Sequence, residues 1–164
     1  KGEMIGINTI IYSSSGSSSG VGFAIPVSTA RRVVADLITY GKVNRGEIKI
    51  SIIQNTKRIA NYAGYKISHG LIITKVQNGS QADVSGLKSG KHAVQFGTFN
   101  PQTIYLGGDI ITAINDISIT KYADYLSALE DKKPGDTVVL TIYRNNKYEK
   151  ISVKLEQSET SHKI

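Results

Sequence analysis

The sequence contains no cysteine and no tryptophan, and it has only three prolines and one methionine in 164 residues. Without cysteine the chain can form neither disulfide bonds nor thiolate metal sites, and redox chemistry gives no information about its compartment. The histidines, His69, His92 and His162, lie far apart and lack the spacing of metal ligands or of a serine relay. We therefore expect neither a metal site nor a cofactor. No apolar run has the length of a membrane-spanning helix.

Clusters of charge are also missing, although the chain is basic. It has 20 lysines and arginines against 13 acidic residues, which gives a net charge of +7. A basic domain raises the question of nucleic-acid binding. The basic residues are scattered, however, and no run of them exceeds two, as at Arg31-Arg32. We therefore expect a solvated surface and no nucleic-acid partner. Hydrophobic residues make up 40% of the chain, which is enough to bury a core.

The first part of the chain predicts a β-hairpin. Residues 4–12 and 21–25 are apolar and rich in β-branched side chains, as strands are. A loop of six serines and two glycines, residues 13–20, joins them. Within it, residues 16–20 fit the G-x-S-x-G pattern of hydrolase nucleophile elbows. Such an elbow needs a helix directly after it. A strand that ends at Pro26 follows instead, so we expect no catalytic serine there.

A helix is expected after this hairpin, at residues 29–40. Ser28 is a suitable N-cap, and Gly41 can end the helix in a left-handed conformation. The polar connector that follows marks the boundary to a second domain.

The most informative stretch is Arg45–Ile53, RGEIKISII. Its isoleucines at positions 48, 50 and 52 alternate with polar residues, which is the period of a half-buried strand. Gly46 can adopt a positive φ and open a turn before that strand. Such a turn can present backbone N–H groups to a carboxylate, and a strand edge can pair with a peptide backbone. The pattern predicts a peptide-capturing edge rather than a catalytic centre.

The rest of the chain predicts short helices and strands. A helix at residues 56–64 is expected to turn Ile59, Tyr62 and Ala63 inward. A strong turn signal, Asn78-Gly79, follows a buried strand. Further strands are expected at 70–76, 107–115, 137–144 and 148–155, with an amphipathic helix at 121–132. An insert at about 89–106 carries enough apolar residues to favour a flap docked on the domain.

Four segments together resemble the HtrA/Deg family of serine proteases: GEMIGINT at 2–9, GFAIPV at 22–27, YGKV at 40–43 and GGDIITAIN at 107–115. The implied fold class is α+β and mostly β. It is a PDZ-like, partly open antiparallel barrel or sandwich with two helices, preceded by a β-hairpin and a helix left over from a trypsin-like β-barrel. The implied domains are 1–43, the protease remnant; 44–157, a PDZ domain with the insert; and 158–164, a polar tail.

The resemblance also implies a function for the chain. The family's catalytic serine, histidine and aspartate would lie upstream of Lys1, so this C-terminal fragment is expected to be inactive, although the parent protein resembles a serine endopeptidase. The expected partners are C-terminal peptides or unfolded protein segments, captured for protein quality control, and the rest of the protease domain. The expected location is extracytoplasmic, either periplasmic or membrane-associated.

By position, the resemblance implies a peptide-binding site made of a carboxylate-binding loop, a groove strand and one helix face. Its residues are Gly46, Glu47, Ile48, Lys49, Ile50, Ile52, Tyr122, Leu126 and Leu129. The family normally has glycine where this chain has Lys49. If that position needs a positive φ, lysine strains the loop. Otherwise its ammonium could strengthen capture of a carboxylate, which Glu47 would oppose.

Two other functions stay open at the level of sequence. The chain could be a structural module whose groove is filled by its own insert or by the tail ending at Ile164. It could also be a peptidase with a nucleophile that the patterns do not reveal. The unpaired strands within residues 4–25, or the tail at 158–164, could also join copies of the chain into a homo-oligomer.

Overall fold

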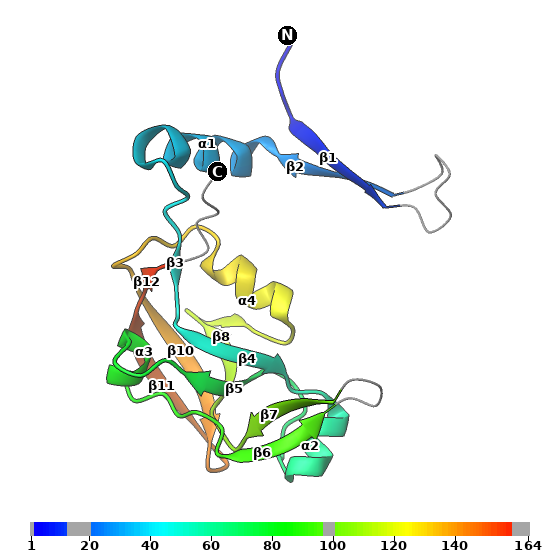
Figure 1. Cartoon of the computed structure of the whole chain (residues 1–164), viewed down its shortest axis with the longest axis vertical. Helices are drawn as coiled ribbons and strands as arrows, with labels where there is room; N and C mark the ends of the chain where they lie inside the picture. Colours follow the sequence, from blue (N-terminus) through cyan, green and yellow to red (C-terminus); the bar gives the residue numbers. More distant parts are fainter. Residues whose placement is uncertain (1, 13–20, 97–100, 159–164) are drawn as a thin grey trace. The chain divides into compact units, whose positions relative to one another are not determined.

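The structure is a computed structural model that describes residues 2–12, 21–96 and 101–158. The described residues form two compact units, one ending at Asn44 and the other starting at Arg45 (Figure 1). The predicted tail at 158–164 lies outside the described residues except for Ser158.

The first unit is a β-hairpin followed by a helix. β1 (Gly6–Tyr12) pairs antiparallel with β2 (Val21–Pro26), and α1 (Val27–Tyr40) follows at once. Gly41 ends the helix at φ 67°, and its N–H donates to the Leu37 carbonyl at 3.0 Å, as predicted. The predicted N-cap Ser28 is wrong, because Pro26 occupies that position. The fixed φ of proline suits the start of a helix, so the helix begins directly after the strand.

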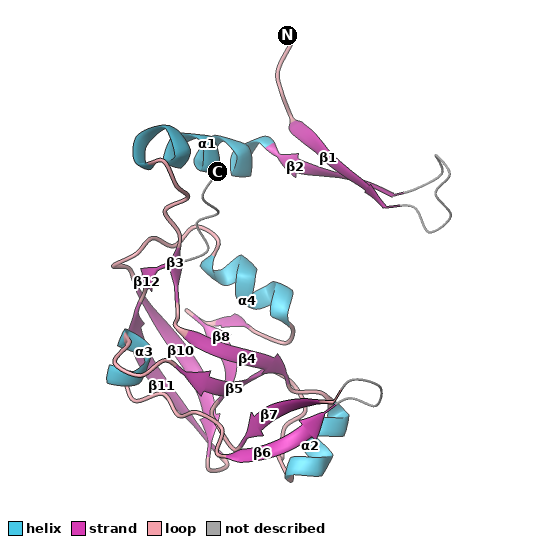
Figure 2. Ribbon diagram, in the orientation of Figure 1, coloured by secondary structure: helices cyan, strands magenta, loops and turns pink. Residues whose placement is uncertain are grey.

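The second unit is built on an open antiparallel sheet with the strand order β11-β10-β8-β5-β4, and β9 pairs with β8 (Figure 2). Two short pairs accompany it, β3 with β12 and β6 with β7. The strands are β3 (Gly46–Glu47), β4 (Ile50–Gln54), β5 (Leu71–Val76), β6 (His92–Phe96), β7 (Gln102–Leu106), β8 (Ile110–Ile114), β9 (Ile117–Ser118), β10 (Thr137–Arg144), β11 (Lys147–Lys154) and β12 (Glu156–Gln157). The helices are α2 (Lys57–Ala63), α3 (Gln81–Val84) and α4 (Tyr122–Leu129). The predicted α+β, mostly β class with an open sheet is confirmed, and α3 adds one short turn of helix.

The sheet is buried on both faces, which explains the apolar run in β5. Successive residues of a strand point to opposite faces. Leu71 and Ile73 of β5 therefore join one hydrophobic cluster, and Ile72 joins the other. Helix α4 contributes Tyr125, Ala128 and Leu129 to the first cluster. The second cluster contains Ile59 of α2 and Leu106 of β7, with Val94 and Ile104 packed against it.

The insert is therefore a docked hairpin, as expected. It covers the face of the sheet that α4 does not cover. The prediction that Tyr62 of α2 points inward is wrong, because its side chain is 73% exposed. Ile59 and Ala60 are the residues of α2 that are buried.

A buried ion pair ties β8 to β10. Both carboxylate oxygens of Asp109, a residue that is 1% exposed, accept hydrogen bonds from Arg144 at 2.7 Å. The Lys88 amide donates to Asp109 Oδ2 at 2.7 Å, and Arg144 Nη2 donates to the Gly86 carbonyl at 2.9 Å. Hydrogen bonding to Asp109 raises the pKa of Arg144 above its ordinary value. The pair therefore positions the loop before β8 as well as the two strands.

We expect Asp109→Asn to lower the free energy of unfolding by about 3 kcal/mol, because it removes the buried carboxylate that accepts two hydrogen bonds from the Arg144 guanidinium. Chemical denaturation measures this change. Asp116→Asn is the matched control, since Asp116 is exposed beside Lys150 and asparagine tolerates its φ of 64°. The control is expected to change stability by less than about 0.5 kcal/mol. Equal effects of the two variants would contradict a structural role for the buried pair.

Candidate functional site

Strand β4 lies at the edge of the sheet. Within the described part of the chain its one sheet neighbour is β5, with Ile50 opposite Val76 and Gln54 opposite Leu71. An edge strand presents backbone groups that a further strand can pair with. The strand predicted from Ile48, Ile50 and Ile52 begins later than expected, because β4 starts at Ile50 and Ile48 belongs to the turn before it.

Gly46, at the start of that turn, is needed for space and not for a positive φ. The φ of Gly46 is not positive, so the predicted left-handed turn at this residue is wrong. Its N–H donates to the Lys132 carbonyl at 2.9 Å. A Cβ on Gly46 would lie 2.6 Å from the Lys133 carbonyl oxygen. The segment after α4 therefore packs directly on the backbone of β3.

Backbone hydrogen bonds, one within the turn and one from the residue after β5, close the turn between β3 and β4. The Ile50 amide donates to the Ile48 carbonyl at 2.8 Å, and the Gln77 amide donates to the Lys49 carbonyl at 3.0 Å. The side chain of Ile48 is buried in the core, and Ile50 and Ile52 pack against the same cluster from partly buried positions. The three isoleucines thus form the inner side of the turn and strand.

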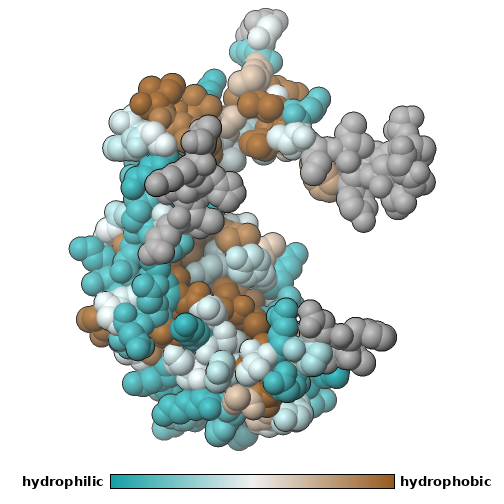
Figure 3. All heavy atoms as spheres, in the orientation of Figure 1, coloured by the Kyte–Doolittle hydropathy of each residue, from teal (hydrophilic) through white to brown (hydrophobic). Residues whose placement is uncertain are grey.

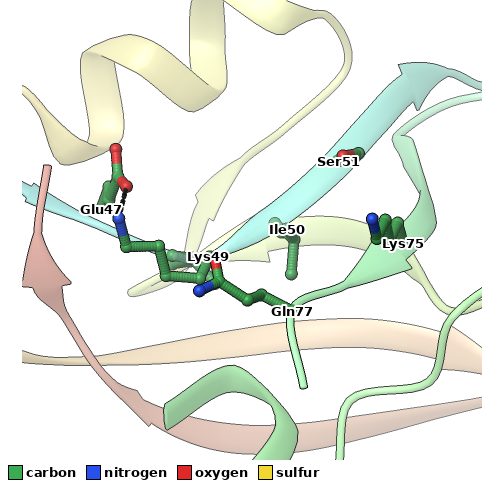
Figure 4. A pocket seen from close by; sticks show the side chains of 7 residues that line it. Glu47, Lys49, Ile50, Ser51, Lys75 and Gln77 are labelled. Carbon is green, nitrogen blue, oxygen red and sulfur yellow. Dashed lines mark ion pairs between the residues drawn. The ribbon is translucent and has the colours of Figure 1, made fainter. Parts of the chain in front are cut away.

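Lys49 has no positive φ, so the strain that lysine would cause in a left-handed position does not arise. Its side chain is only 8% exposed, and its ammonium forms an ion pair with the carboxylate of Glu47, which is 29% exposed. In Figure 4 the Lys49 side chain runs back along the turn to reach Glu47. The sequence left open how Lys49 acts, and the structure places it beside an acid of its own turn.

The three residues predicted to form the wall of the site all lie on helix α4, and two of them are exposed while one is buried. Tyr122 is 53% exposed and Leu126 is 45% exposed, whereas Leu129 is buried in the core. Tyr122 stacks on Tyr125, with ring centroids 6.1 Å apart. Hydrophobic side chains also gather on the face over α4 and β4 (Figure 3). Tyr122 and Leu126 are thus the exposed members of the predicted wall, and Leu129 is part of the core.

Glu47 is electrostatically coupled to this helix. Burial raises the pKa of the Tyr125 hydroxyl, and the neighbouring Tyr122 and the carboxylate of Glu47 raise it further. A negative charge close to a phenol disfavours the phenolate. The carboxylate of Glu47 in the turn is therefore close enough to α4 to add to this increase in the pKa of Tyr125.

A hollow of about 370 Å³ lies at the turn and the first residues of β4. Its lining consists of Glu47, Ile48, Lys49, Ile50, Ser51, Lys75 and Gln77 (Figure 4). Three of these residues, Ser51, Lys75 and Gln77, were not predicted. Ser51 and Lys75 are register partners on β4 and β5. The one available signal was Lys75, the only charged residue of β5.

The described residues hold no group of three or more histidines, aspartates or glutamates that could bind a metal ion. None of the helices among these residues is long and apolar enough to cross a membrane.

Comparison with protein families gives a match to the PDZ domain over residues 46–155. The chain is 38% identical over 154 residues to a probable periplasmic serine endoprotease of the DegP-like type from Brucella suis, covering 94% of this chain and 26% of the relative. It is 32% identical over 160 residues to the periplasmic pH-dependent serine endoprotease DegQ of Escherichia coli, covering 98% of this chain and 31% of the relative. The chain thus spans about a quarter to a third of the length of these relatives.

Comparison with solved structures gives matches among the HtrA-type proteases. The protease AlgW with a decapeptide matches with a TM-score of 0.70 and 25% identity, over 96% of this chain and 43% of that chain. A serine endoprotease from Yersinia pestis matches in fold with a TM-score of 0.60 and 23% identity, over 96% of this chain and 44% of that chain.

Asp124 fixes the start of α4 and so positions Tyr122. Its Oδ2 accepts from the Thr120 hydroxyl at 2.6 Å, and from the Thr120 and Lys121 amides at 2.9 and 3.0 Å. These bonds, led by the Thr120 hydroxyl, lower the pKa of Asp124 below 3.8. Because the folded pKa lies below the unfolded one, the cap contributes stability above pH 3.8, which is lost as the pH falls through the folded pKa.

We expect Thr120→Val to raise the pKa of Asp124 toward 3.8, because it removes the strongest of these hydrogen bonds. NMR titration of the Asp124 carboxyl carbon measures the shift. Thr137→Val, at an exposed position of β10, is the control and should leave the Asp124 titration unchanged. An unaltered titration in Thr120→Val would show that the hydroxyl does not hold the cap.

Proposed function

The chain belongs to the PDZ family, with a PDZ domain of the HtrA/DegP type, and we propose that it binds C-terminal or extended segments of proteins by strand addition along β4. The observation that carries this proposal is the position of β4 at the sheet edge, next to a turn that contains a lysine. A peptide that adds a strand there obtains main-chain hydrogen bonds whatever its sequence.

The ligand would lie between β4 and α4. The turn of Gly46, Glu47, Ile48, Lys49 and Ile50 would face its terminal carboxylate. The Ile50 amide already donates a hydrogen bond to the Ile48 carbonyl. We therefore expect it to contribute less to carboxylate binding than the rest of the turn. The last apolar side chains of the ligand would contact exposed groups of α4 and the partly buried side chain at the centre of β4: Tyr122, Leu126 and Ile52. Leu129 would form the floor beneath them.

At the scale of the parent protein, we propose that residues 1–43 belong to the end of a trypsin-like protease domain and that 44–157 form its PDZ domain. The relatives named periplasmic serine endoproteases, and the HtrA-type protease AlgW with a bound decapeptide, support this assignment. The module would feed misfolded or unfolded segments to an extracytoplasmic serine endopeptidase, or report peptide occupancy to it. The apolar side chains exposed on the first unit, among them Ile7, Phe23 and Ile38, are suited to packing against the rest of such a protease domain.

The central test is binding of peptides that end in a hydrophobic residue, measured by fluorescence anisotropy with the full chain. We expect micromolar affinity, about −8 kcal/mol, for peptides with a free terminal carboxylate. The same peptides with an amidated terminus are expected to bind about tenfold more weakly, because the turn then receives no charge. Equal binding of acids and amides across a peptide library would refute carboxylate capture, and no binding of either would refute the proposed function.

The proposed wall on α4 is tested with Leu126→Ala. We expect about fivefold weaker peptide binding, because a half-exposed leucine loses the apolar area that a ligand would cover. Stability should fall by less than about 1 kcal/mol, since the side chain is 45% exposed in the unliganded chain. Val84→Ala, at a residue of α3 that is 74% exposed, is the control and should leave binding unchanged. Unaltered affinity in Leu126→Ala would move the ligand away from α4.

A further inference from the structure

We propose that Glu47 is a built-in competitor for the ligand's carboxylate: it occupies the ammonium of Lys49 in the unliganded domain and yields it to the terminal carboxylate of a bound peptide. Lys49 then supplies selectivity for free acids, and Glu47 sets the affinity at which they bind. The inference rests on the proposed function, since it concerns the same site.

The first support is the burial of Lys49. Its side chain is 8% exposed, although it stands in a turn at the edge of a sheet. A buried ammonium is tolerated when a carboxylate lies beside it, because the attraction offsets part of the lost hydration. Glu47 supplies that carboxylate from two residues away in the same turn. The site is thus already organised around an ammonium–carboxylate contact before any ligand arrives.

The second support is the unequal exposure of the two partners. Glu47 is 29% exposed, more than three times as much as Lys49. A carboxylate with access to water can leave the pair at a lower cost than the more deeply buried lysine side chain can. The partner that is exchanged is therefore the acid. A ligand carboxylate that takes its place keeps Lys49 paired throughout.

The third support is the composition of the hollow around the pair. Two basic residues, Lys49 and Lys75, and one acidic residue, Glu47, line it together with the polar residues Ser51 and Gln77. Basic groups thus outnumber acidic ones, and a ligand carboxylate would balance the charge. The hollow begins at β4, where the proposed peptide strand would end. A neutral amide terminus would have no means of displacing Glu47.

The test uses the full chain with one peptide sequence as free acid and as amide, measured by isothermal titration calorimetry. Glu47→Gln removes the competitor and is expected to bind the acid about tenfold more tightly than the unmodified chain, with the amide unchanged. The double variant Glu47→Gln with Lys49→Met removes both charges. The double variant is expected to lose the tighter binding of the acid that Glu47→Gln shows. Its ratio of acid affinity to amide affinity is expected to be about tenfold lower than that of the unmodified chain. Asp116→Asn and Lys150→Gln, an exposed ion pair on β9's turn and β11, are matched controls and should change neither quantity.

The double variant also protects the test against misfolding. Glu47→Gln removes the acid beside a buried ammonium and could unfold the turn, whereas the double variant removes both charges of the pair, a change that is generally tolerated. Thermal unfolding of each variant identifies which of them are folded. If Glu47→Gln is unfolded, the test rests on the double variant. A ratio of acid affinity to amide affinity equal to that of the unmodified chain then overturns the inference.

The possible outcomes distinguish failure of the competitor role of Glu47 from failure of the proposed peptide binding. An unmodified chain that prefers acids, with a Glu47→Gln variant that binds them no more tightly, overturns the competitor and leaves the peptide-binding function standing. A gain in Glu47→Gln that persists in the double variant overturns the role of Lys49. If the unmodified chain binds neither peptide, the proposed function fails, and the competitor fails with it.

Discussion

The whole of the second unit depends on a sheet whose central strands are covered on both faces. β5 and β8 place alternate residues in two separate hydrophobic clusters, so helix α4 must cover one face while α2 and the β6–β7 hairpin cover the other. The two strands at the ends of this sheet, β4 and β11, are therefore the ones whose outer edges could pair with a further strand. The two edges differ in character, and that difference is the reason why we propose strand addition at β4 and not at β11.

β11 is an edge that resists pairing, because it carries exposed charged residues such as Lys147, Glu149 and Lys150. β4 instead alternates partly buried isoleucines with a small polar residue, Ser51, and it begins at a hollow with a buried lysine. Charge protects the first edge from non-specific strand addition. The second edge combines backbone groups, apolar contacts and a positive charge at one end, which are the three features that a terminal peptide strand can use.

The turn before β4 depends on a segment far away in the sequence. Gly46 lies against the Lys132 and Lys133 carbonyls, which follow α4, and β3 pairs with β12 near the end of the described chain. The position of α4 is in turn fixed by Asp124 at its start and by Tyr125, Ala128 and Leu129 in the core. The turn and the helix are therefore held in one frame.

The sequence alone determined most of the secondary structure and the family of the fold. Alternating isoleucines predicted β4, the apolar run predicted β5, and the strands expected at 137–144 and 148–155 are found as the paired β10 and β11. These features follow from local periodicity and backbone preference, which a single sequence records. The tertiary structure decided the chemistry of the site: why position 46 is glycine, which face Tyr62 and Leu129 take, and that Lys49 is buried against Glu47. Each of these depends on which distant segment packs against the residue, and local sequence contains no record of that neighbour.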